Sequence, residues 1–432
     1  MIKKLIVSAV ALVTTLSELS FAESVPTTAD DLSASVARIP KAERPRIAEK
    51  LAQIQSITLS QIKEIQTTLL NIRSDTVTAT TTKDLALNAK EQDLIDTRRA
   101  FVASQVAKQV VSGTAVNLPP KDLEQIVPDM LESIAIASNP MLPTCGTSLS
   151  YLGDSAQAGW QDILGKFLKD HGDVLSSVGR LEIETETVGP PDASGIPAKK
   201  NVRTSVGSAF AISQHQVVTA GHVAAMFWDP KTNGFRDGVK SVIFDTGGEY
   251  EFGCKKPSPD ARSVRIATAT EYKYTPNVAP KNAPVDFAIL RIASDEKPLN
   301  ATLTIAENVN IPVSSFIIVV EYPANDNRVN QILWRSAMSV PIEGGGMFPV
   351  TNIKRVAPGM IVPACENSAS LHVTHDATTL NRSSGAPILD AATGQVIGLQ
   401  VSGFRDLGGV GQYCNLGIKA NNATFANAVL EK

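Results

Sequence analysis

Three widely separated segments of the chain each carry one residue of a possible catalytic set, in the order His, Asp, Ser. His222 follows a turn of small residues, Asp286 stands at the head of an apolar run, and Ser384 lies in a tight turn before a strand-like segment. A serine hydroxyl is a poor nucleophile until a base takes its proton, so His222 would accept that proton and later donate it to the leaving group. Asp286 would fix the tautomer of the imidazole. The set predicts acyl transfer at Ser384.

The sequence around each of these residues forms a short block. Residues 219–222 read T-A-G-H, residues 286–290 read D-F-A-I-L, and residues 383–387 read S-S-G-A-P ahead of V-I-G at 396–398. These blocks resemble the T-A-A-H, D-I-A-L and G-D-S-G-G-P blocks of the chymotrypsin-like (trypsin-like) serine peptidases, especially the bacterial trypsin-like and glutamyl endopeptidase variants. The resemblance covers residues 174–432. It implies an all-β double six-stranded barrel and a serine endopeptidase that hydrolyses peptide bonds through an acyl-enzyme.

The same resemblance assigns the oxyanion hole to the backbone N–H groups of Arg382 and Ser384, each typically worth about 10²–10³-fold in rate. The family usually has glycine at the position of Arg382, because the turn suits a residue without a Cβ. Two interpretations follow: an active hydrolase with a strained turn, or a catalytically inactive homologue that acts as a binding or scaffold protein. The intact triad favours the active enzyme. Ser383 replaces the aspartate that pairs with a new N-terminus in the family's zymogens, so that activation switch is not expected.

Specificity is also inferred from the resemblance. It places Thr378 at the base of the specificity pocket and Val401, Ser402 and Gly403 along its wall. None of these residues is acidic, so cleavage after Lys or Arg is not expected. Glutamate-specific relatives have a histidine where this chain has Gln400. We therefore expect a small or medium-sized neutral side chain at the cleavage site.

The remaining histidines have structural interpretations. His171 and His215 are expected at the surface. His372 and His375 are three apart in a segment that favours a strand, where this spacing places them on opposite faces rather than around a metal ion. His375 could still approach the pocket wall, because it precedes the nucleophile block closely. No metal and no cofactor are expected.

The four cysteines, Cys145, Cys254, Cys365 and Cys414, include no C-x-x-C pair. This argues against a zinc knuckle or a thioredoxin-type site. In an oxidising compartment they allow up to two disulfides and three pairings, among which Cys365 with Cys414 is favoured because both flank the nucleophile segment. The alternative is four buried free thiols.

The elements that must position these residues change character along the chain. From residue 174 onward, short β-branched runs alternate with Gly, Pro, Asn and Asp clusters, which indicates an all-β domain over residues 174–432. Residues 189–200 are expected to form a loop, and residues 146–173 a linker with a short helix at 160–168. The predicted strands are 178–184, 208–212, 217–219, 241–244, 287–292, 316–320, 332–336 and 396–401.

Residues 23–145 are predicted to be mainly α-helical. Ile62, Ile65, Leu69 and Ile72 form one apolar stripe, and further helices are expected at 84–111 and 121–137. The stripe needs a partner surface. The region is either a prosegment, an inhibitory module or a self-association arm, or a small helical domain that only packs against the main one.

The first residues predict export. Lys3 and Lys4 precede a short apolar run, and the Ser20-Phe21-Ala22 pattern suits signal peptidase, so residues 1–22 are expected to be removed. No later stretch approaches the length of a membrane span, so a secreted or periplasmic protein without a membrane anchor is expected. The net charge of −3 and the pI of about 6.0 give no footprint for nucleic acid. The expected partners are protein or peptide substrates.

Overall fold

The computed structural model of the protein describes residues 139–149, 158–191, 197–248, 262–275, 285–326, 334, 337–341, 347–362, 371–403 and 415–430. The predicted signal peptide, the predicted helices before residue 138, and Cys254, Cys365 and Cys414 lie outside these ranges, so the disulfide pairing stays a prediction. No helix in the described ranges is long and apolar enough to cross a membrane.

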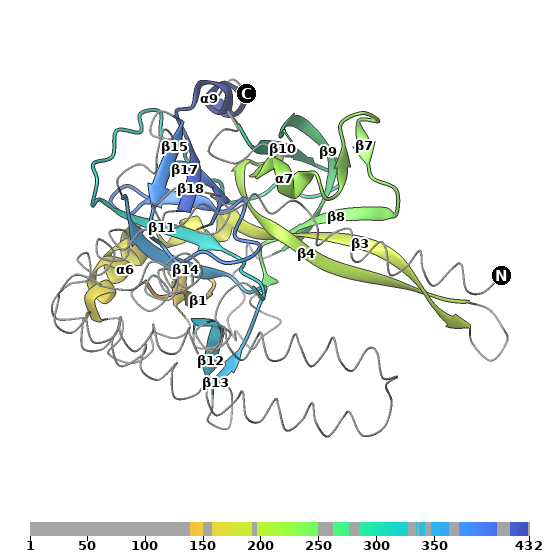
Figure 1. Ribbon diagram of the computed structural model, residues 1–432, viewed down its shortest axis with the longest axis horizontal. Coiled ribbons are helices and arrows are strands. Elements are labelled where there is room, and N and C mark those ends of the chain that lie inside the picture. The colour runs from red at the N-terminus through yellow and green to blue at the C-terminus, as the bar shows by residue number, and fades with distance from the viewer. Residues whose placement is uncertain are drawn as a thin grey trace, which may run out of the picture.

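Six strands form a closed antiparallel barrel in the order β10-β5-β4-β3-β8-β9. Their interior is apolar, because alternate residues of each strand point inward. Phe210, Val218, Phe244 and Ile289 are among the fully buried side chains. The strands are β3 (Val178–Pro191), β4 (Pro197–Ser213), β5 (Gln216–Thr219), β8 (Val239–Asp245), β9 (Ser263–Lys273) and β10 (Phe287–Ile292). This barrel confirms the first half of the predicted fold (Figure 1).

β3 and β4 continue as a two-stranded ribbon beyond the barrel (Figure 1). Their register extends to the Pro191–Pro197 pair, whereas the pairing of β3 with β8 stops at Thr185. The prediction of a loop at 189–200 is therefore wrong for residues 189–191 and 197–200, which belong to strands. Residues 192–196 are not described. Prolines are compatible with these strands because the outer edge of β3 has no further described neighbour to require its N–H groups.

The second sheet has eight strands in the order β15-β18-β17-β16-β11-β14-β1-β2, and it differs from the six-stranded barrel that was expected. An isolated bridge between Ile361 and His375 brings the chain after β14 back to β15. Six strands thus curl round, while β1 and β2 extend the sheet beyond β14. The strands are β1 (Leu142–Cys145), β2 (Ser148–Leu149), β11 (Phe316–Glu321), β14 (Arg355–Met360), β15 (His372–His375), β16 (Pro387–Asp390), β17 (Val396–Ser402) and β18 (Asn415–Lys419).

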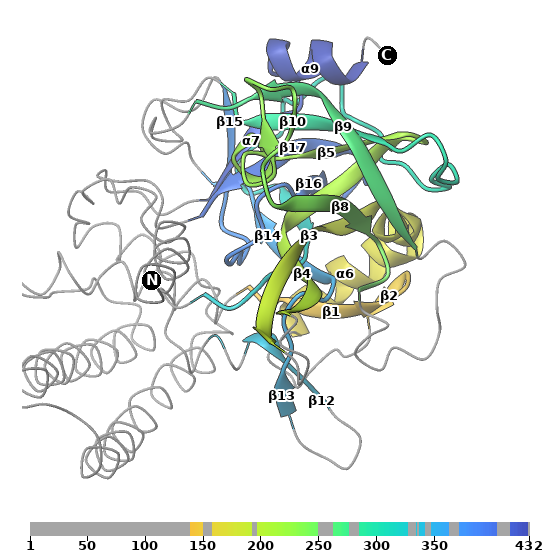
Figure 2. The same ribbon diagram turned by 90° about the vertical axis from the view of Figure 1, so that its right-hand side faces the viewer.

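The remaining elements lie around these two sheets. They are α6 (Ala158–His171), the 3-10 helix η2 (Gly172–Ser177), α7 (Gly221–Ala224), β6 (Trp228–Asp229), β7 (Gly234–Phe235), β12 (Ser339–Pro341), β13 (Met347–Pro349) and α9 (Ala423–Leu430). Figure 2 shows α9 at one end of the molecule and the β12–β13 hairpin at the other. α9 packs against the barrel through Phe425. The Phe425 and Phe287 rings pack edge to face, with their centroids 5.1 Å apart.

The short helix expected at 160–168 is confirmed by α6. The strand expected at 332–336 is wrong at its described residue, Trp334, which is helical. Trp334 is buried, and its indole Nε1 donates to the Ala324 carbonyl oxygen at 3.3 Å. This tertiary contact outweighs the β propensity of the apolar run.

Candidate active site

Two neighbouring strands of the barrel hold His222 and Asp286 side by side. β5 and β10 are antiparallel, with Thr219 opposite Ala288, so Asp286, which directly precedes β10, lies beside the residues that follow β5. The Asp286 carboxylate contacts His222 twice. Its Oδ2 lies 2.7 Å from Nδ1 of the ring, and its Oδ1 accepts from the His222 backbone nitrogen at 2.8 Å. A carboxylate can only accept here, so the Nδ1 atom carries the proton and Nε2 is left to act as a base.

Gly221 makes this close approach possible. A Cβ at this position would lie 2.5 Å from the Lys273 carbonyl oxygen and 2.9 Å from Asp286 Oδ1. Any side chain would therefore displace the aspartate from the histidine. The glycine in the T-A-G-H block is required by packing.

Ser384 lies in the turn that leads into β16, and it is partly exposed. The next residue, Gly385, has a φ of +90° and donates its N–H to the Gln400 carbonyl oxygen at 2.8 Å. Only glycine adopts such a φ readily. The tight turn thus projects Ser384 from the start of a buried strand.

Ser208 of β4 fastens this turn to the barrel. Its backbone nitrogen donates to the Ser384 carbonyl oxygen at 2.9 Å, and its hydroxyl donates to the Arg382 carbonyl oxygen at 3.0 Å. The same hydroxyl accepts from the Tyr322 nitrogen at 3.0 Å. Ser208 is completely buried. The sequence placed it in a strand but did not indicate that it joins the two sheets.

The neighbouring residue of β4 relates the Ser384 turn to His222. A Cβ on Gly207 would lie 2.7 Å from the Val223 side chain and 3.1 Å from the Ser384 carbonyl oxygen. Val223 follows His222 in α7. The histidine helix and the serine turn therefore approach the same residue, at the junction of the barrel and the second sheet.

Arg382 adopts the left-handed conformation, with a φ of 69°, which costs a non-glycine residue about 1–3 kcal/mol. The Asn381 carbonyl oxygen accepts from the Ala324 nitrogen at 2.8 Å. The C=O and N–H of a trans peptide point in opposite directions, so the Arg382 N–H is turned away from Ala324. In the described part of the chain, neither the Arg382 nor the Ser384 amide donates to a backbone oxygen. The arginine thus holds the conformation in which glycine was expected.

Comparison with known protein families matches residues 207–399 to the trypsin-like peptidase domain. These residues include the His222, Asp286 and Ser384 blocks. The chain carries a trypsin-like peptidase domain. The family resemblance inferred from the three blocks is thereby confirmed.

Solved structures similar to this chain include two proteases. An HtrA-type protease, AlgW, with a decapeptide is 17% identical with a TM-score of 0.39, and the match covers 61% of this chain and 67% of that one. A Glu endopeptidase is 14% identical with a TM-score of 0.35, and the match covers 60% of this chain and 89% of that one. A comparison with curated proteins found no match.

The residues expected to form the specificity pocket lie in β17 and in segments that adjoin strands of the second sheet. Val401 and Ser402 end β17 and are buried, while Gly403 beside them is partly exposed. Thr378 is also buried, and its hydroxyl donates to the Asn139 carbonyl oxygen at 2.7 Å. The sequence could not indicate that the chain preceding β1 contacts Thr378.

His375 contacts β17, the strand that includes Val401 and Ser402. Its Nε2 lies 2.7 Å from Gln400 Oε1, and the Gln400 amide nitrogen donates to the Ser402 carbonyl oxygen at 2.8 Å. Burial lowers the pKa of His375 to about 4, and the hydrogen bond to Gln400 offsets only part of this effect. The His375 ring is therefore neutral at neutral pH.

This buried histidine makes folding stability depend on pH. In the unfolded chain His375 binds a proton below about pH 6.5, whereas in the folded chain it does so only below about pH 4. The contribution of neutral His375 to the free energy of unfolding is therefore complete above pH 6.5 and decreases as the pH falls from 6.5 to 4. We expect the free energy of unfolding to fall by up to about 1.4 kcal/mol per pH unit. Urea unfolding at several pH values gives the free energy of unfolding as a function of pH. This function should be less steep for His375→Gln than for the wild type, and as steep as the wild type for His215→Gln, a change at an exposed histidine. Equal slopes for all three proteins would contradict the assignment.

A buried carboxyl group near the Ser384 turn could not be recognised from the sequence. Glu321 ends β11 and is fully buried. Burial raises the pKa of Glu321 to about 8, against the opposing effects of the Ser383 hydroxyl and the Arg355 guanidinium. The Ser383 hydroxyl in turn accepts from the Leu380 nitrogen at 2.9 Å. Glu321 and Arg355 face each other across β11 and β14, a pairing that sequence patterns alone do not define.

Among the other histidines, His215 is exposed, as expected, and His171 is partly exposed with its Nε2 3.0 Å from the Ala392 carbonyl oxygen. His372 is buried in β15. Within the described ranges, no group of three His, Cys, Asp or Glu residues could hold a metal ion.

Proposed function

We propose that this protein is an exported serine endopeptidase that hydrolyses peptide bonds with His222, Asp286 and Ser384. The observation that carries the proposal is the double contact of the Asp286 carboxylate with His222, within a domain that matches the trypsin-like peptidases. This contact prepares Nε2 of the ring as a base, which is the state that serine activation needs.

The reaction follows from the chemistry of these groups. His222 Nε2 takes the Ser384 hydroxyl proton as the oxygen attacks the substrate carbonyl carbon, and the imidazolium is stabilised by Asp286. The developing oxyanion accepts from the N–H groups of Arg382 and Ser384. His222 then protonates the leaving amine, and an acyl-enzyme on Ser384 remains. A water molecule, activated by the same histidine, releases the acid.

The environment of the pocket supports a neutral side chain at the cleavage site. Gln400 and Ser402 are uncharged, and His375 is neutral above about pH 4. A buried cation that could pair with a glutamate side chain is therefore missing from these pocket residues. We infer a preference for small or medium-sized neutral residues, with export to the periplasm or the medium, and with the N-terminal region as a covering or self-association module.

The second candidate function is a binding or scaffold protein without catalysis. It is supported by Arg382, because active members of the family usually have glycine at this position of the turn. This candidate predicts tight binding of a peptide without turnover.

A fluorophosphonate probe separates the two candidates. The probe reacts with a serine only when an adjacent base and an oxyanion hole activate it. We expect a single adduct on Ser384 of the folded full-length chain, located by peptide mass spectrometry, and none on Ser384→Ala. The same experiment on chain lacking residues 23–138, which keeps β1 and its pairing with β14, tests whether those residues block the site. An absence of adduct in both forms would refute the hydrolase and favour the binding protein.

A further inference from the structure

The Arg382 side chain has a contact outside the Ser384 turn. Its Nη1 donates to the Asn352 Oδ1 atom at 3.3 Å. Arg382 is partly buried, and Asn352 lies in the segment before β14. Any force on the Arg382 side chain acts on the backbone whose N–H is proposed to bind the oxyanion.

Asn352 is itself held by three hydrogen bonds. Its carbonyl oxygen accepts from Arg180 Nη1 at 3.1 Å, and its backbone nitrogen donates to the Pro323 carbonyl oxygen at 2.8 Å. Its Nδ2 donates to the Thr351 hydroxyl at 3.3 Å, which turns Oδ1 toward Arg382. The φ of 58° is left-handed, a conformation that asparagine tolerates better than most residues. The amide is thus oriented before it meets the arginine.

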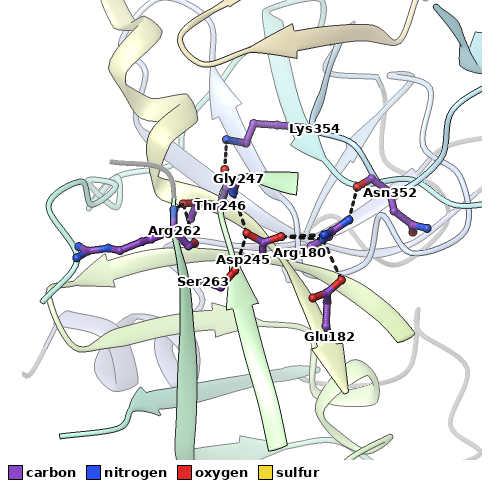
Figure 3. A network of polar contacts seen from close by, with 9 residues as sticks. All are labelled: Arg180, Glu182, Asp245, Thr246, Gly247, Arg262, Ser263, Asn352 and Lys354. Carbon is purple, nitrogen blue, oxygen red and sulfur yellow. Dashed lines mark hydrogen bonds and ion pairs between the residues drawn. The ribbon is translucent and has the colours of Figure 1, made fainter. Parts of the chain in front are cut away.

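Arg180 provides the rigid end of this series of contacts. It lies on β3, almost fully buried, and its guanidinium is paired with Asp245 at 2.9 Å and with Glu182 at 3.1 Å. Arg180 and Asp245 are opposite each other in the β3–β8 register. Figure 3 shows the Arg180 guanidinium between the two carboxylates and the Asn352 carbonyl oxygen. The buried ion pair of Arg180 with Asp245 fixes the Arg180 guanidinium, and this limits the movement of the Asn352 carbonyl group that accepts from it.

We propose that Asn352, anchored by Arg180, is a positioning residue for the oxyanion turn: it holds the Arg382 side chain so that the Arg382 N–H stays directed at the developing oxyanion. The inference rests on the proposed hydrolase function. It explains how an arginine occupies a glycine position, since the tether offsets the strain of a left-handed backbone. The barrel thereby controls a turn that belongs to the second sheet.

Asn352→Gly tests the tether without adding strain, because glycine accepts the φ of 58° and the backbone contacts of residue 352 are kept. The change removes the acceptor for Arg382 together with the Nδ2 donor to Thr351. We measure the rate of Ser384 labelling by a fluorophosphonate in the full-length chain. Asn352→Gly should lower the limiting rate about tenfold, with little change in the probe concentration for half-maximal rate, since oxyanion donors act in the transition state. Asn352→Asp keeps the acceptor and should remain within about threefold of the wild type.

A double-mutant cycle separates this role from a general structural one. In the Arg382→Gly background there is no side chain to hold, so adding Asn352→Gly should change the labelling rate by less than about twofold. A tenfold loss in both backgrounds, or an unchanged rate in Asn352→Gly alone, would overturn the inference while the hydrolase function stands. Wild-type protein that is not labelled at Ser384 would instead overturn the proposed function, and the positioning role with it.

Discussion

Replacing Asp286 with asparagine should lower turnover about 10⁴-fold while the fold is retained. The reason lies in the two contacts of the carboxylate. The His222 backbone N–H is a fixed donor 2.8 Å from Oδ1, so the asparagine must present its carbonyl oxygen there. Its NH₂ group then faces the ring Nδ1 2.7 Å away and forces that atom to accept. The proton moves to Nε2, which can no longer take the Ser384 proton.

The measurement is the fluorophosphonate labelling rate of Asp286→Asn, together with its urea unfolding curve. Asp295→Asn is the matched control, since Asp295 is an exposed partner of Arg265 and its loss should leave labelling unchanged and stability within about 0.5 kcal/mol. A rate within about tenfold of the wild type for Asp286→Asn would show that the aspartate does not set the tautomer.

The positions of His222 and Asp286 could be predicted because local patterns define them. Each stands at the end of a short apolar strand, and hydrogen bonding between β5 and β10 then brings the two together without any long loop. The glycine next to His222 belonged to the same block. Short motifs near the ends of paired strands are therefore enough to predict the relative positions of His222 and Asp286.

The contacts that stabilise the Ser384 turn could not be predicted in this way. Ser208 and Asn352 are each distant in sequence from Arg382, which both of them contact, and neither belongs to a motif of its own. Their roles depend on how the second sheet docks on the barrel. Hydrophobic periodicity reports which face of a strand is buried, but not which buried polar atoms meet.

Two of the departures from the predicted fold have the same origin. The prolines and glycines of residues 189–200 predict a loop, yet pairing along one edge is enough to form the end of the β3–β4 ribbon there. Trp334 was predicted in a strand because of its apolar neighbours, yet its indole hydrogen bond accompanies a helical backbone. In both cases tertiary contacts decided between local conformations of similar energy.

The second large effect is expected for Gly385→Ala. A Cβ at Gly385 would lie 2.0 Å from the Ser208 carbonyl oxygen and 2.3 Å from Thr219 Oγ1, and the φ of +90° disfavours any L-residue. The Ser208 carbonyl already accepts from the Thr219 hydroxyl at 2.7 Å within β4 and β5, so the barrel cannot yield locally. The turn must move instead. We expect a loss of roughly 3 kcal/mol in the free energy of unfolding from overpacking and backbone strain together.

Because Ser384 precedes Gly385 directly, a displacement of about 1 Å should also slow fluorophosphonate labelling about 10²-fold or more. Two glycines serve as matched controls. Gly238 has a φ of +85° with open space around it, so Gly238→Ala isolates the backbone strain. Gly165 lies exposed in α6 with nothing near its Cβ, so Gly165→Ala should stabilise the protein by about 0.5–1 kcal/mol. If Gly385→Ala loses no more stability than Gly238→Ala and labels at the wild-type rate, then the close packing of the turn against Ser208 does not determine where the nucleophile stands.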